Sequence, residues 1–177
     1  MREIYLDNSA TTCAYKEVGE LVGKVMCEDY GNPSSIYSVG RKAKKAIEQA
    51  RERVASLLNC NSNEIYFTGC GSESDNMAIK GIAYKNKKKG NHIITSKIEH
   101  PAVLNTCKNL ETKGFEVSYI GVDKKGIIDV EELKNSIKDT TILISVMTAN
   151  NEIGTIQLIE EISKLAKFYG IIFHTDA

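Results

Sequence analysis

Apolar residues recur at helical spacing in the first third of the chain. The first apolar stripe predicts a helix that ends at the Gly-Asn-Pro break of residues 31–33. A second stripe, from Ala43 to Leu58, predicts the longest helix, with basic residues on its solvated face. A short extended segment at residues 4–6 precedes both. The first stripe consists of Val18, Leu21, Val22, Val25 and Met26.

Beyond residue 64, short apolar runs alternate with amphipathic stretches, which predicts strands alternating with helices. The nearly continuous apolar run of residues 141–147 predicts a central strand that is buried on both faces. This order is typical of an α/β fold with a mostly parallel sheet flanked by helices. The strands are expected at 65–68, 92–95, 117–120, 141–147 and 171–174, and the helices from Ser72, Pro101, Val130 and Ile159 onward.

Composition and charge narrow the classes of function. Of the 177 residues, 42% are hydrophobic and 26% are charged, as in an ordinary folded protein. Lys plus Arg and Asp plus Glu both number 23, so no net field would draw the chain to nucleic acid or an anionic membrane. The five cysteines form no Cys-x-x-Cys pair, and no apolar run approaches the roughly 18 residues of a membrane helix. We therefore expect reduced thiols and a cytoplasmic protein.

The segment from Thr68 to Ser74 joins an expected strand to an expected helix. Its glycines allow close approach to the backbone, and the free amides of a helix start suit a phosphate group. The alternative is that Ser72 only caps its helix and the glycines make a tight turn. A dinucleotide site is less favoured, because the third small residue of that motif is replaced by Ser74.

Three further polar segments each follow an expected strand. These are Glu99-His100-Pro101, Asn150-Asn151-Glu152 and His174-Thr175-Asp176. Singly, each is more often a turn or a cap than a site, and three histidines this far apart do not suggest a metal site. Together with the phosphate segment they offer a ring-shaped side chain, an amide and a carboxylate at the carboxyl ends of strands. That set suits a phosphorylated heteroaromatic cofactor.

Six segments of the sequence, in order, resemble the successive motifs of cysteine desulfurases, a family in the class V aminotransferase branch of the fold-type-I pyridoxal-phosphate enzymes. The resemblance implies an amino-terminal arm at residues 1–14 and an incomplete pyridoxal-phosphate-binding large domain at 15–177. It also implies the sheet order 3-2-4-5-6-7-1, in which strand 65–68 has no neighbour within the chain and strand 171–175 is an exposed apolar edge. The six segments are residues 5–12, 31–35, 67–76, 99–100, 150–157 and 174–177.

The resemblance also implies a role for each matching residue. Gly71 and Ser72 would hold the phosphate of pyridoxal phosphate, and His100 would stack on the ring and transfer protons. Asn151 would hydrogen-bond the phenolic oxygen. Asp176 would pair with the pyridine nitrogen and keep it protonated, so that the ring can act as an electron sink.

The implied activity is removal of sulfur from L-cysteine, giving alanine and an enzyme persulfide for iron–sulfur cluster assembly or thiolation. In the family, the cofactor-binding lysine and the sulfur-accepting cysteine lie beyond the Asp176 motif, so we expect this portion to be inactive alone. The full-length enzyme is expected to be a homodimer that serves a sulfur-acceptor protein. One alternative is a non-catalytic truncated product that binds a partner or cofactor. Another, left open by Tyr37 and Gly69, which depart from the family pattern, is a selenocysteine lyase or another class V enzyme.

Overall fold

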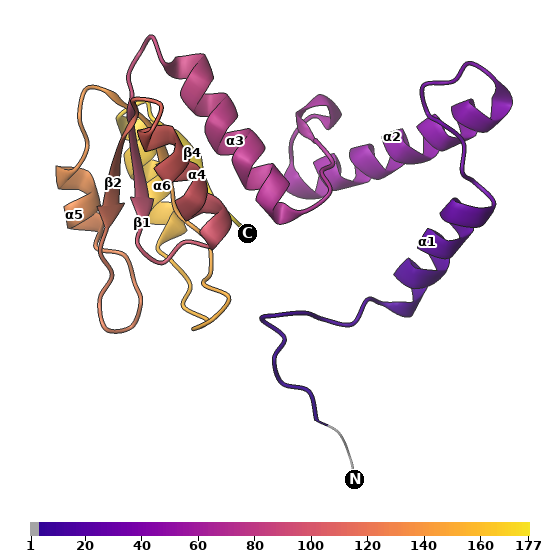
Figure 1. Cartoon of the computed structure of the whole chain (residues 1–177), viewed down its shortest axis with the longest axis horizontal. Helices are drawn as coiled ribbons and strands as arrows, with labels where there is room; N and C mark the ends of the chain where they lie inside the picture. The colour runs from indigo at the N-terminus through magenta and orange to yellow at the C-terminus, as the bar shows by residue number, and fades with distance from the viewer. Residues whose placement is uncertain (1–3) are drawn as a thin grey trace. The chain divides into compact units, whose positions relative to one another are not determined.

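The computed structural model describes residues 4–177, which divide into two compact units between Phe67 and Thr68 (Figure 1). The first unit contains helix α1 (Lys16–Cys27), helix α2 (Ser38–Leu58) and the 3-10 turn η1 (Ser62–Glu64). Among residues 4–177, no helix has both the length and the apolar composition that crossing a bilayer requires.

Both helices expected in the first unit are confirmed, and α2 is the longest helix of those described. Asn59 ends α2 in the left-handed conformation, with φ of 53°. The apolar stripe of α1 is exposed throughout, because α1 has no buried residue. Residues 4–6 lie outside any strand and are exposed.

The strand expected at residues 65–68 is absent from the described structure, so that prediction is wrong, but the expectation that this segment has no neighbouring strand is confirmed for residues 4–177. Tyr66 and Phe67 are exposed, and no strand of residues 4–177 pairs with this segment. The Arg51 guanidinium instead donates to the Ile65 carbonyl oxygen and lies 5.0 Å from the centre of the Phe67 ring. An extended segment forms a strand only beside another strand, and a short apolar run alone does not supply one.

The second unit is built on a parallel four-stranded sheet in the order β2-β1-β3-β4. This order matches the 3-2-4-5 part of the expected sheet, and it confirms the α/β fold. All five residues of β3 are buried at an internal position, as the apolar run predicted. Strand β4 is an edge with Ile172 exposed. The strands are β1 (His92–Ser96), β2 (Glu116–Ile120), β3 (Thr141–Ser145) and β4 (Ile172–His174).

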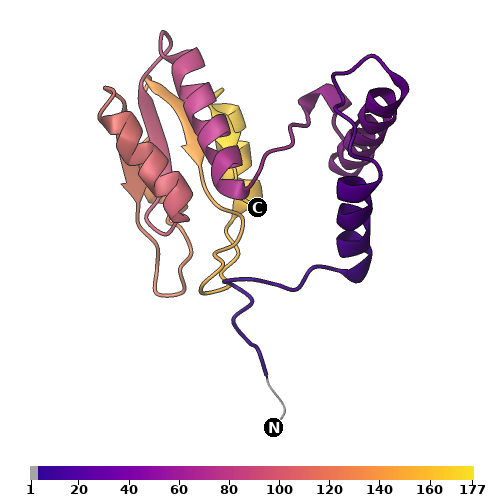
Figure 2. The same ribbon diagram turned by 45° about the vertical axis from the view of Figure 1, so that its right-hand side comes forward.

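Helices cover both faces of the sheet (Figure 2). Helices α3 (Gly71–Asn86) and α4 (Pro101–Glu111) pack on one face, where Ile79, Ile93 and Leu110 belong to one buried cluster. Helices α5 (Val130–Asn135) and α6 (Ile159–Phe168) pack on the other face, in a second cluster. Strand β1 contributes Ile93 to the first cluster and Ile94 to the second, because successive side chains of a strand point to opposite faces.

His92 has a structural role at the start of β1. Its Nδ1 lies 2.7 Å from the Thr141 hydroxyl and its Nε2 2.9 Å from the Ser118 hydroxyl, so the buried ring links β1 to its two neighbours, β3 and β2. Burial, with a smaller contribution from Lys138, lowers the pKa of His92 below its usual range. Within the described residues, no cluster of His, Cys, Asp and Glu side chains could hold a metal ion.

The turn before β1 requires glycine at position 90. A Cβ atom added there would lie 2.2 Å from the carbonyl oxygen of Thr140, which already accepts the His92 amide. We expect Gly90→Ala to lower the free energy of unfolding by about 1–3 kcal/mol, because backbone must move to relieve the clash. The control is Gly81→Ala, where an added Cβ in the middle of α3 would meet nothing within 4 Å. It should instead stabilise the chain by about 0.5–1 kcal/mol. Urea unfolding measures both, and equal effects would contradict the packing at Gly90.

Candidate functional site

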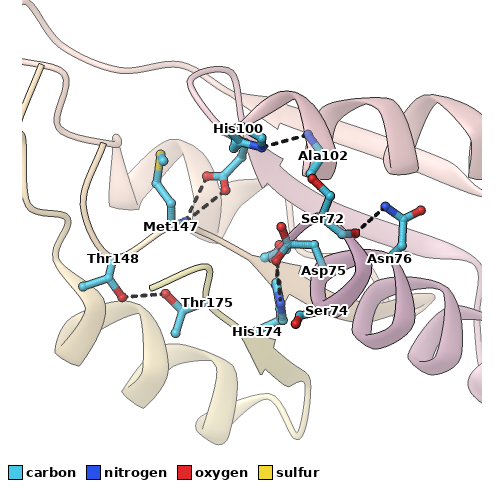
Figure 3. Close-up of polar contacts among 12 residues, drawn as sticks. Ser72, Ser74, Asp75, Asn76, His100, Ala102, Met147, Thr148, His174 and Thr175 are labelled. Carbon is cyan, nitrogen blue, oxygen red and sulfur yellow. Dashed lines mark hydrogen bonds and ion pairs between the residues drawn. The ribbon is translucent and has the colours of Figure 1, made fainter. Parts of the chain in front are cut away.

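Polar side chains from four segments of the second unit gather at the carboxyl ends of β1, β3 and β4 (Figure 3). The start of α3 supplies Ser72 and Asp75, and His100 follows β1. Thr148 and its neighbours follow β3, and Thr175 follows β4. Parallel strands place their carboxyl ends at one edge of the sheet, so segments far apart in sequence meet there.

The start of α3 offers two open backbone donors. Cys70 is the residue before the helix, and its carbonyl oxygen accepts from the amides of Glu73 and Ser74. Among the described residues, the amides of Gly71 and Ser72 have no hydrogen-bond acceptor. Ser72 lies inside the helix, and its hydroxyl does not cap it, so the alternative reading of Ser72 as the cap is wrong. The open amides lie at the positive end of the helix dipole, which suits an anion.

His100 directly precedes α4 as its N-cap residue and is exposed. Its Nδ1 accepts the Ala102 amide at 3.1 Å, which fixes the ring as the cap of the helix. An Nδ1 that accepts a backbone N–H carries no proton, so a neutral ring has its proton on Nε2. The ring therefore presents Nε2 to the site while Nδ1 is held by the helix.

Glu99 is buried beside His100 and binds the segment that follows β3. Its carboxylate accepts the Ser96 hydroxyl at 2.5 Å and the Met147 amide at 3.1 Å. Burial raises the pKa of Glu99 to about 7, although these hydrogen bonds oppose the rise; the charges of Asp176 and Asp75 add to it. Glu99 belongs to the sequence motif Glu99-His100-Pro101, but the motif alone indicates no role for it.

Asn150 and Asn151 differ sharply in their surroundings. Asn150 is buried, donates from Nδ2 to the Ile98 carbonyl oxygen at 2.9 Å, and accepts the amides of Glu152 and Ile153. Asn151 is exposed. The residues on both sides line a cavity of about 300 Å³ that also includes His100. Asn151 thus lies at the mouth of a cavity shared with His100.

Asp176 is partly buried just beyond β4. Its carbonyl oxygen accepts the Thr148 amide at 2.8 Å, and the hydroxyls of Thr148 and Thr175 lie 2.8 Å apart. These contacts extend the pairing of β3 with β4 and fix the backbone of residue 176. The negative charge of Asp176 acts to raise the pKa values of Asp75, Glu99 and His174.

A row of largely buried polar side chains lies beneath this edge, and the sequence alone indicates no role for it. His174 Nδ1 lies 2.9 Å from the Ser145 hydroxyl, and Nε2 lies 3.7 Å from Asp75 Oδ1. Burial raises the pKa of Asp75 and lowers that of His174. Burial thus works against the charged form of both partners, and we describe this contact as polar rather than as a full ion pair. The signal in the sequence is the spacing of Asp75, three residues after Ser72 and four before the buried Ile79.

The sequence matches the family described as Aminotransferase class-V over residues 4–177. The chain belongs to the aminotransferase class-V family. This result confirms the class V branch that the motifs implied. Enzymes of the family depend on pyridoxal phosphate.

Individual relatives point to cysteine desulfurases within the class V family. The chain is 58% identical over 176 residues to the cysteine desulfurase IscS of Clostridium botulinum (strain Hall), covering 99% of this chain and 44% of the relative. It is equally similar to the cysteine desulfurase IscS of Methanosarcina thermophila, with the same coverage. The chain thus spans less than half the length of these relatives. These matches confirm the resemblance to cysteine desulfurases.

Solved structures agree with this family assignment. A NifS-like protein superposes with a TM-score of 0.95 at 42% identity, over 99% of this chain and 49% of that one. The protein described as SspA in complex with cysteine superposes with a TM-score of 0.93 at 43% identity, over 98% of this chain and 50% of that one. The fold of this chain is therefore the corresponding part of the class V fold.

Proposed function

We propose that this chain supplies the cofactor-binding part of a pyridoxal-phosphate-dependent cysteine desulfurase. The observation that carries the proposal is the gathering of two open amides, an exposed imidazole and a carboxylate at one edge of the sheet. The names of the relatives support cysteine as the substrate, as does the cysteine complex of SspA. The products would be alanine and sulfur carried as a persulfide on an enzyme cysteine.

The residues at this edge fit the cofactor. A phosphate needs donors, and the free amides of Gly71 and Ser72 at the start of α3 provide them. A pyridine ring needs a flat neighbour and a carboxylate at its nitrogen, which His100 and Asp176 would supply. Asn151 would donate to the phenolic oxygen. When bound, the cofactor supplies an electron sink for bond breaking at the substrate.

The residues of the chain would divide the work between binding and proton handling. The Asp176 carboxylate would hold a proton on the ring nitrogen, because a negative charge at short range favours the protonated form of its partner. Nε2 of His100 would move protons at the substrate, since its Nδ1 is engaged by the Ala102 amide. The carboxyl groups of Glu99 and Asp75 lie buried at this edge, and burial raises the pKa of both.

The remaining parts of the proposal rest on the family resemblance. They are a homodimer and a sulfur-acceptor protein for the full-length enzyme, with iron–sulfur cluster assembly or thiolation as the use of the sulfur. Mixing the enzyme with cysteine and candidate acceptors, then following labelled sulfur, would test the acceptor.

Gly71→Pro should weaken cofactor binding by about tenfold relative to Gly71→Ala, because proline removes an N–H that would bind a charged phosphate. Position 71 is the first residue of α3, where proline is well tolerated, and the preceding Cys70 is extended, with φ of −169° and ψ of 168°. An added Cβ would meet nothing within 4 Å, so alanine is a matched control that keeps the N–H.

The measurement is calorimetric titration of the chain with 4-deoxypyridoxine 5′-phosphate. This probe keeps the ring nitrogen, phenolic oxygen and phosphate but has no aldehyde with which to modify lysines. Equal affinities of the proline and alanine variants would contradict the phosphate site at α3. Absence of any binding by the unaltered chain would contradict the proposed cofactor site as a whole.

A further inference from the structure

Two loops frame the cavity beside His100, and buried side chains connect them. We call residues 97–100 the β1 loop and residues 146–153 the β3 loop. From the β1 loop, the Glu99 carboxylate accepts the amide of Met147 in the β3 loop. From the β3 loop, the Asn150 side chain donates to the carbonyl oxygen of Ile98 in the β1 loop. Each loop therefore sends one side chain across to the backbone of the other.

The two connecting residues occupy equivalent places in their loops. Glu99 is 4% exposed and directly precedes the exposed His100. Asn150 is 8% exposed and directly precedes the exposed Asn151. In each loop, then, a buried residue reaches across to the opposite backbone and the next residue faces the cavity. The backbone positions of His100 and Asn151 are set by these crossing hydrogen bonds.

Each connecting side chain is also held within its own loop. The Ser96 hydroxyl donates to the Glu99 carboxylate at 2.5 Å. The Asn150 side-chain oxygen accepts the Glu152 and Ile153 amides at 2.9 and 3.0 Å. If Glu99 swung away, the buried Met147 amide and Ser96 hydroxyl would lose their acceptor, and if Asn150 did so, its buried side-chain amide would lose the Ile98 carbonyl oxygen. Both changes cost free energy. The two connections are therefore rigid at both ends.

We propose that Glu99 and Asn150 are positioning residues that form a crossed clamp, which fixes His100 and Asn151 relative to one another at the proposed cofactor site. This inference rests on the proposed function and adds residues that touch neither cofactor nor substrate. An apolar side chain at position 99 would avoid the burial of a carboxyl group, but it would leave the Met147 amide without an acceptor. The clamp thus explains why a carboxyl group lies buried behind His100.

The test compares Glu99→Ala, Glu99→Gln and Asn150→Ala with the unaltered chain. Alanine at either position removes one arm of the clamp. Glutamine keeps an oxygen acceptor for the Met147 amide and can donate to the Ser96 hydroxyl, so it is the conservative replacement. Glu131→Ala is the control, because Glu131 is an exposed carboxylate on α5 that does not line the cavity beside His100.

The first readout is amide hydrogen exchange at Met147, and the second is affinity for 4-deoxypyridoxine 5′-phosphate. Glu99→Ala should speed exchange at Met147 and weaken the probe, each by about tenfold, while the core amide of Ile144 stays protected. Asn150→Ala should weaken the probe similarly, and the double variant should be less than additive. Glu99→Gln should restore values close to those of the unaltered chain, and Glu131→Ala should leave them unchanged.

The outcomes separate the clamp from the proposed function. If the unaltered chain fails to bind the probe, the proposed function fails, and the clamp is then judged by Met147 exchange and by the rate at which diethyl pyrocarbonate modifies His100. Unchanged probe affinity in folded Glu99→Ala would overturn the clamp, as would a failure of glutamine to rescue. Uniform loss of protection at Met147 and Ile144 would show a merely structural role. If Glu99→Ala does not fold, Asn150→Ala and Glu99→Gln decide the question.

Discussion

Replacing Asp176 by asparagine should lower turnover of cysteine by about a hundredfold or more, with a much smaller loss of cofactor affinity. The amide of asparagine has no negative charge, so it cannot hold a proton on the ring nitrogen as a carboxylate does. The phosphate site at the start of α3 lies on a different segment and would remain. Asp176→Asn is therefore expected to lower mainly the turnover rate, whereas Gly71→Pro is expected to lower mainly the cofactor affinity.

The assay needs a protein of the relatives' length, because this chain spans 44% of them. Joining Ala177 to the carboxyl-terminal part of the Clostridium botulinum relative supplies such a protein. The matched part of that relative is 58% identical to this chain. Alanine formation from L-cysteine measures turnover, and titration with 4-deoxypyridoxine 5′-phosphate measures binding. The control is Asp139→Asn, an exposed carboxylate outside the six motif segments. Equal losses of rate and affinity in Asp176→Asn and Gly71→Pro would show that the roles are wrongly assigned.

Glu99→Gln should stabilise the chain at alkaline pH and have little effect at acid pH. The pKa of Glu99 in the fold is about 7, above its ordinary value of 4.5. The folded state therefore binds this proton more tightly than the unfolded state does. Stability from the protonated carboxyl is fully present below about pH 4.5 and is lost as the pH rises through about 7. A pKa difference of this size corresponds to about 3 kcal/mol of stability. Glutamine does not titrate, so the variant avoids this loss of stability.

The measurement is urea unfolding of both proteins at about pH 5 and about pH 8, on either side of the Glu99 pKa. The difference between variant and unaltered chain isolates Glu99, because Asp75, Asp176 and Cys107, whose charges interact with it, are present in both. The difference should grow with pH. A gap that is the same at the two pH values would mean that Glu99 remains ionised, with its charge balanced by the Ser96 and Met147 donors.

The local sequence pattern was sufficient to predict most helices and strands of the second unit. Helix α4 begins with Pro101, as expected, and Gly114 beyond its end has φ of 85°. Asp129 caps α5 by accepting the Glu132 amide at 3.0 Å. The reciprocal half of that capping box is missing, since the Glu132 carboxylate binds the Gly121 amide instead. Periodicity, proline and glycine act over a few residues, so the sequence displays them directly.

The features that the local sequence pattern did not reveal depend on contacts between residues far apart along the chain. Residues 65–68 have the apolar run of a strand but no neighbouring strand among residues 4–177, an absence that only the family resemblance implied. The Glu99 bond to Met147 joins residues 48 apart, and the Asp75 contact with His174 joins α3 to β4. Motif matching found the exposed residues of the candidate site. The buried residues behind them became visible only through the fold, because their roles depend on partners far along the chain.

The strand order also bears on how the second unit folds. The outer pairings are comparatively local: His92 meets Ser118 across 26 residues, and Ser145 meets His174 across 29. The central pairing of β1 with β3 is more distant, with His92 meeting Thr141 across 49 residues. Closing a longer loop costs more chain entropy, so this seam should join last, after the two β-α-β halves have formed. The crossing hydrogen bonds behind His100 and Asn151 span the same seam. A chain that contained only one of the two halves would form the helices and strands of that half. It would lack the paired loops on which catalysis would depend.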